Sequence, residues 1–225
     1  MRMSAAPPTG GHVTTVVLLA LAWNCQLLGY SHRADALPML WTGCAVLLGV
    51  TALGRLRPTR VGLTAPQAML LLGAIDMALG LLVDFHATQL GSLGSVCGLA
   101  DRNLWAMMQL HWVLLPWMHV GMWVGGFAAI PLLRAIRPTC RRQYCVRLAQ
   151  NVACSVWMTV GMSFGVLIAE YLASQSGAPS PVSMLGGMIS GMVWGMVASV
   201  ALYRLYFRLR LMFVLNIDRR SAELL

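Results

Sequence analysis

The chain has 225 residues, of which 58% are apolar and only 10% are charged, and its mean hydropathy is +0.71. Soluble domains carry about 25% charged residues, so this composition excludes a water-soluble surface of ordinary kind and predicts one polytopic membrane domain over residues 1–225. All sixteen basic residues are arginine, and they give a formal charge of +9. Because they lie in short segments between apolar runs, the charge indicates loop retention in the cytosol and no nucleic-acid partner.

Six apolar runs are long enough for a transmembrane helix, which needs about 20 residues. Lipid offers no partner for unpaired backbone groups, so each run is predicted to be helical. The predicted fold is therefore an all-α integral membrane protein, a compact bundle of about six transmembrane helices with short loops, in contact with the lipid bilayer. In chain order the predicted spans are 13–30, 37–54, 66–89, 104–133, 148–173 and 182–207.

The arginines predict the orientation of the bundle. Fourteen of the sixteen precede the first span, lie at or beyond the end of the last one, or lie in the loops after the second and fourth spans, whereas Arg33 and Arg102 lie in the opposite loops. By the positive-inside rule both termini are cytoplasmic, and the chain is a multi-pass protein of the inner (plasma) membrane. Cleavage of the first span as a signal peptide is the alternative, since Ala34-Asp35-Ala36 resembles a cleavage site. That site lies well beyond the most apolar stretch, which favours retention.

The third predicted span carries ionisable side chains, each of which costs at least about 2.5 kcal/mol at the bilayer centre. Asp76 lies near its middle, Asp84 lies two turns nearer the outer end, and His86 follows. The two carboxylates fall within about 80° of each other on an ideal helix. For Asp84 and His86, and also for Glu170 in the fifth span, helix capping or pairing with Arg102 is as good an explanation as ligand binding. Asp76 has no helix end within reach, so it predicts a partner or a hydrated cavity.

Imidazole and thioether groups share one face of the fourth predicted span. This face covers about 60° of arc on an ideal helix and is bordered by His119. Its residues are Met107, His111, Met118 and Met122. These ligand types suit Cu(I) and other soft transition ions. Pro116 removes one backbone hydrogen bond, so it predicts a kink between the two histidines.

The sixth predicted span carries methionines and glycines on two neighbouring ridges at four-residue spacing. The methionines are Met184, Met188, Met192 and Met196, and the glycines of this "glycine ridge" are Gly187, Gly191 and Gly195. Glycine at every fourth position lets another backbone approach closely. The glycine ridge therefore predicts contact with a membrane-protein partner or with a second copy of the chain. In the fifth span, Met158 and Met162 add two thioethers one turn apart.

These patterns favour a small inner-membrane permease or handling protein for a transition-metal ion, with copper preferred. No nucleotide-binding loop and no H-E-x-x-H pattern is present in the sequence, and we expect no enzymatic activity. The candidate metal-binding residues are His111, His119, Met107, Met118, Met122, Asp76, Asp84, His86, Met162, Met188 and Met192.

Three other interpretations stay open. Methionine is a common gap-filler in apolar interiors, so the methionine stripes are also explained by packing alone. The chain is alternatively a non-catalytic accessory or assembly subunit of a membrane complex, with the glycine ridge as a docking face. The last alternative is a proton-coupled solute transporter in which Asp76 carries the proton.

Overall fold

The computed structural model describes residues 9–28, 36–56, 64–87, 104–136, 144–176 and 181–223. Within these ranges the chain forms seven helices and no strand, which confirms the predicted all-α class. The helices are α1 (Thr9–Leu28), α2 (Ala36–Leu56), α3 (Ala65–Ala87), α5 (Leu104–Leu114), α6 (Pro116–Ile136), α7 (Tyr144–Ser176) and α8 (Pro181–Glu223). Every described residue of the six predicted spans except Leu115 lies in a helix, and positions 29–30 and 88–89 of these spans lie outside the described residues.

Three of these helices contain a stretch long and apolar enough to cross a membrane. The stretches are Ala65–His86 in α3, Gln150–Leu172 in α7 and Met184–Arg210 in α8. Large apolar side chains are also exposed on the outside of the bundle, among them Val16, Leu48 and Phe164. Such a surface suits lipid, because soluble monomers rarely expose large contiguous apolar patches. Six crossings and cytoplasmic termini stay predictions.

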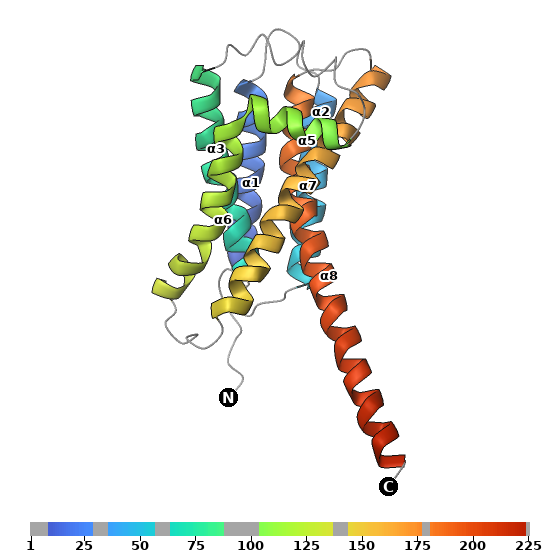
Figure 1. Cartoon of the computed structure of the whole chain (residues 1–225). Coiled ribbons are helices and arrows are strands. Elements are labelled where there is room, and N and C mark those ends of the chain that lie inside the picture. Colours follow the sequence, from blue (N-terminus) through green and yellow to red (C-terminus); the bar gives the residue numbers. More distant parts are fainter. Residues whose placement is uncertain are drawn as a thin grey trace, which may run out of the picture.

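The long helices run side by side and alternate in direction, while α5 lies across one end of the bundle (Figure 1). At the opposite end α8 continues past its neighbours (Figure 1). Its 43 residues make it about twice as long as the 30 Å hydrocarbon layer is thick. The last part of α8 therefore lies outside the bundle, beyond the end of α2.

Two pairs of helices make the most extensive contacts in the molecule. One is α3 with α6, the other is α7 with α8, and α2 and α1 pack mainly against α8 and each other. Both pairs bring backbone against backbone at glycines. A Cβ added to Gly80 on α3 would lie 2.8 Å from the Met118 Cα on α6, and one added to Gly165 on α7 would lie 2.8 Å from the Gly191 Cα on α8. Small residues permit this approach where lipid supplies no hydrophobic drive.

The predicted range 104–133 is divided between two helices that meet at Leu115. Pro116 begins α6, where its missing N–H is tolerated because first-turn N–H groups have no partner in their own helix. Hydrogen bonds continue across the junction, from Leu115 N to His111 O at 2.9 Å and from His119 N to Leu115 O at 3.4 Å. The kink expected at Pro116 is large enough to turn α5 across the bundle (Figure 1). A single ideal helix therefore does not describe the face that carries the two histidines.

Candidate functional site

The start of α6 is capped by a carboxylate from α3. Asp84 Oδ1 accepts a hydrogen bond from Trp117 N at 3.2 Å, and Oδ2 accepts one from Met118 N at 2.8 Å. These N–H groups have no partner within α6, and the negative charge lies at the positive end of the helix dipole. The carboxylate is buried, with 2% of Asp84 exposed. The structure thus shows Asp84 in the capping role that the sequence left as an alternative to ligand binding.

The two histidines flank this junction and are both 1% exposed. The rings of His111 and His119 are nearly parallel, at an angle of 26°, and their centroids lie 6.4 Å apart. An ion held in line between one nitrogen of each ring at about 2.0–2.1 Å would set the centroids of two imidazoles roughly 6.3 Å apart, and a bent arrangement would bring them closer. The centroid spacing of the two rings therefore matches linear coordination of a shared ion.

The ring of His119 is held in place from two sides. Its Nδ1 lies 2.8 Å from the carbonyl oxygen of Leu115, and because a carbonyl only accepts, Nδ1 carries the proton. In the neutral ring the lone pair is then on Nε2. Trp112 stacks against the same ring, with centroids 4.7 Å apart and planes at 24°. An N–H donated to a backbone carbonyl is the usual support of a metal-binding histidine.

His111 is the least satisfied polar side chain of the site. Both of its ring nitrogens are buried, and neither has a hydrogen-bond partner among the residues that the structure describes. A buried polar group without a partner costs about 1–3 kcal/mol. An imidazole kept in such a place by the fold is the feature of this molecule that most strongly indicates a ligand.

The junction gathers only some of the predicted site residues. Met118 is 1% exposed and directly precedes His119, so His111, His119, Met118 and Asp84 lie around one helix start. Asp76 lies farther along α3, where its Oδ2 is 2.6 Å from the position of a Cβ added to Gly125. Asp76 and Gly125 belong to the same α3–α6 contact as the junction.

The other predicted ligands are spread through the bundle. Met122 is fully buried and packs on α3, since its Cγ lies 3.9 Å from the position of a Cβ on Gly73. His86 is exposed near the end of α3, and the side chain of Met107 lies outside the described residues. Three further predicted ligands are fully or almost fully buried in the α7–α8 pair, namely Met162, Met188 and Met192. In the described ranges, no three His, Cys, Asp or Glu side chains form a group that could hold a metal ion.

The glycine ridge of α8 contacts α7 of the same chain. A Cβ on Gly191 would collide with the backbone of Gly161 and lie 3.0 Å from the Gly165 Cα. A Cβ on Gly161 would lie 2.8 Å from the Gly195 Cα. The predicted close backbone contact thus exists within the molecule. Contact with a second protein at this ridge stays a prediction, and such a partner would have to bind beside α7.

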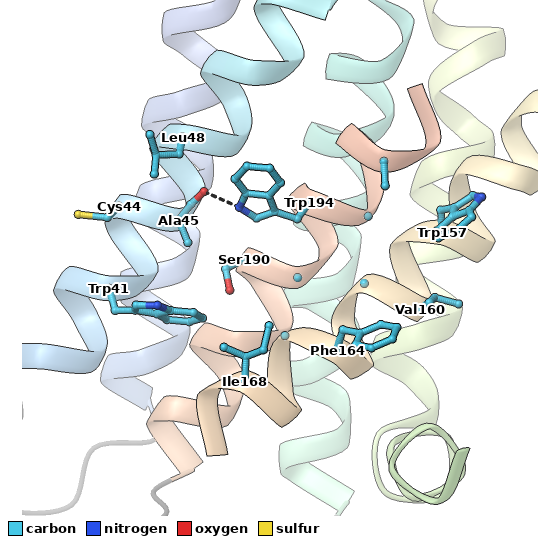
Figure 2. A pocket seen from close by; sticks show the side chains of 15 residues that line it. Trp41, Cys44, Ala45, Leu48, Trp157, Val160, Phe164, Ile168, Ser190 and Trp194 are labelled. Atoms are coloured by element: carbon cyan, nitrogen blue, oxygen red, sulfur yellow. Dashed lines mark hydrogen bonds between the residues drawn. The ribbon is translucent and has the colours of Figure 1, made fainter. Parts of the chain in front are cut away.

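A pocket of about 570 Å³, which the sequence did not predict, lies between α2, α7 and α8. Figure 2 shows its aromatic walls, with Trp194 donating from Nε1 to the carbonyl oxygen of Ala45 at 3.1 Å. Trp41 and Trp157 also line it. The only sequence signal was a tryptophan in each of three separate spans, which does not reveal that they meet.

The chain matches no family model, no curated protein and no solved structure. Its function is therefore inferred from its own geometry. The junction between α5 and α6 is the candidate functional site, because its two histidines have a fitting separation, His119 has a fixed tautomer, and the His111 ring has no partner among the described residues.

Proposed function

We propose that the protein binds a soft transition-metal ion, Cu(I) in preference, at the α5–α6 junction and carries it across the inner membrane. The observation that carries this proposal is the buried His111 ring, whose two nitrogens have no partner among the described residues. His119 supplies a second imidazole at a fitting distance, and Met118 supplies a thioether from the adjacent position. The ion is the cargo of the protein, not a resident cofactor.

The donor set favours Cu(I) over harder or more highly coordinated ions. Structural zinc takes four N, S or O ligands in a tetrahedron, and the described ranges hold no group of three or more His, Cys, Asp or Glu. Thioether and imidazole ligands suit Cu(I). Both oxygens of Asp84 already accept backbone hydrogen bonds, so the carboxylate acts through electrostatic attraction and by fixing the start of α6.

Movement of the ion requires several weak sites, which the buried methionines of α6, α7 and α8 supply in this proposal. Six crossings with both termini in the cytoplasm belong to the same proposal. In support, Arg55 lies in the last turn of α2, and the C-terminal part of α8, which carries Arg204, Arg208 and Arg210, extends at the same end of the bundle (Figure 1). The positive-inside rule assigns this end to the cytoplasm.

Copper retention by the purified full chain tests the proposal. Cu(I) is added to the protein in detergent under reducing conditions, a competing chelator is titrated in, and the bound copper per chain is measured. We expect wild type to hold one equivalent and His111→Leu to bind about tenfold more weakly or worse, the scale on which even outer-shell changes act. His119→Leu should resemble it.

Met69→Leu is the matched control, because Met69 is 2% exposed in the core of α3 and has no proposed ligand role. It should retain the affinity of wild type. Equal copper binding by wild type and by the His111→Leu, His119→Leu double variant, at equal folded yield, would overturn the proposal. A stoichiometric partner found with copper-free protein would then favour the accessory-subunit function.

A further inference from the structure

The pocket between α2, α7 and α8 is a groove with a backbone floor and aromatic walls (Figure 2). The floor consists of glycines from the α7–α8 contact, and the walls of large apolar side chains. The floor residues are Gly161, Gly165, Gly191 and Gly195, and the main wall residues are Trp41, Leu48, Trp157, Phe164, Ile168 and Trp194. Because glycine has no side chain, the groove lies along the line where the two backbones approach each other.

The dimensions of the groove restrict what it can hold. Its lining on α7 extends from Trp157 to Ile168, which at 1.5 Å per residue gives a length of about 16 Å parallel to the helices. The volume of about 570 Å³ spread over that length leaves a mean cross-section of about 35 Å². A helix with side chains is at least 10 Å wide, with a cross-section of about 80 Å². A helix would therefore rest on the rim of the groove, whereas a single flexible chain fits inside it.

The chemistry of the lining restricts the occupant further. None of the described residues that line the groove is charged. Ser190 and Trp194 are already engaged, since Ser190 Oγ donates to Gly187 O at 3.1 Å and Trp194 Nε1 donates to Ala45 O at 3.1 Å. Polar ligands are oriented by a few convergent polar groups, and the other polar atoms of this lining, the indole nitrogens of Trp41 and Trp157 and the thiol of Cys44, belong to largely apolar side chains. Its occupant is therefore apolar.

The groove opens to the side of the bundle. Leu48 is 62% exposed, and Phe164 and Ile168 are each 50% exposed. Leu48 lies on the outer surface of α2, and Phe164 and Ile168 lie on that of α7, which is long and apolar enough to cross a bilayer. A chain that enters from the side and lies parallel to these helices has the orientation of a lipid tail.

We propose that the groove binds one hydrocarbon tail of a membrane phospholipid, which packs against the indoles of Trp157 and Trp194 and covers the glycine floor. The groove shares no residue with the copper-binding junction, because it is built from α2, α7 and α8, whereas His111 and His119 lie on α5 and α6. Filling the groove should leave copper binding unchanged.

Quenching of tryptophan fluorescence by a phosphatidylcholine with brominated tails tests the site. The full chain is purified in detergent, and the lipid is added from a fraction of one to about ten molecules per chain. We expect quenching in wild type to saturate near one lipid per chain. Ala198→Phe and Cys44→Phe, which add an aromatic ring to two different sides of the groove, should each abolish the saturable phase.

Leu79→Phe is the control, because Leu79 is exposed on α3, away from the groove; it should quench as wild type does. Quenching that rises with lipid without saturation, or that is equal in wild type and both groove-filling variants, would overturn the proposal. A stable dimer that Ala198→Phe separates would also overturn it, by assigning the groove to a second copy of the chain.

Discussion

The α3–α6 pair and the α7–α8 pair are built on the same antiparallel register. In each pair, three positions four residues apart on the second helix oppose three such positions on the first. The opposing positions are Gly80–Trp117, Asp76–Gly121 and Leu72–Gly125 in one pair, and Gly165–Gly187, Gly161–Gly191 and Trp157–Gly195 in the other. In all six, the Cβ position of a glycine meets a carbonyl oxygen of the opposing residue.

The two pairs differ in what occupies equivalent positions. The α3–α6 contact holds Asp76 where the α7–α8 contact holds Gly161, and it continues to the Asp84 cap and the buried histidines. The α7–α8 contact is made of glycines bordered by methionines and tryptophans, and its outer side is the apolar groove. One backbone arrangement thus supports a polar site in one half of the molecule and an apolar surface in the other. The difference resides in the side chains added to the contact.

The largest effect is expected in the α7–α8 pair, where the two backbones leave no room for a side chain. Gly191→Leu would place a branched side chain against the backbone of Gly161, which cannot move as a flexible side chain can. We expect a loss of at least about 3 kcal/mol in the free energy of unfolding, the upper range for overpacking. Thermal unfolding in detergent measures it.

Val197→Leu adds a single methylene on the same helix, near the edge of its buried face, and serves as the control for Gly191→Leu. Its unfolding temperature should stay close to that of wild type. If both variants unfold at the same temperature, α7 and α8 do not meet at the glycine ridge, and the shared register of the two pairs is lost.

An intermediate effect is expected at the Asp84 cap, which only the α3–α6 pair possesses. Asp84→Leu leaves the N–H groups of Trp117 and Met118 without their acceptor, which should destabilise the protein by about 2 kcal/mol. Asp84→Asn keeps an acceptor oxygen and should lose about half as much. Copper affinity should fall together with stability in Asp84→Leu, since the cap positions the residues between the two histidines. Unaltered stability in both variants would contradict the capping role.

A smaller effect is expected from adding one methyl group to the first pair. In Gly125→Ala the new Cβ would lie 2.5 Å from the Leu72 carbonyl oxygen and 2.6 Å from Asp76 Oδ2. Relief by small helix shifts should limit the loss to about 1 kcal/mol. Gly54→Ala is the control, because nothing lies within 4 Å of its added Cβ, and the better helix propensity of alanine should make it neutral or slightly stabilising. Equal unfolding temperatures would place Gly125 outside the α3–α6 contact.

Local features of the chain were predictable from sequence, because they depend only on residue type and order. The apolar runs determine the helices, since backbone groups in lipid must bond within their own segment. Pro116 determines a kink, since it lacks an N–H. The four-residue spacing of Gly187, Gly191 and Gly195 determines a close backbone contact. None of these inferences needs knowledge of which helices are neighbours.

Tertiary structure alone decided which groups meet. Asp84 caps α6 across a separation of 33 residues, and its choice between cap and ligand depends on where α6 begins in space. The spacing of His111 and His119 follows from the turn at Leu115 and not from the ideal helix used to group them. The partner of the glycine ridge proved to be α7, and the groove exists only where three helices converge. Periodicity specifies which face of a helix makes contact, but the neighbour on that face is selected by the packing energy of the whole bundle.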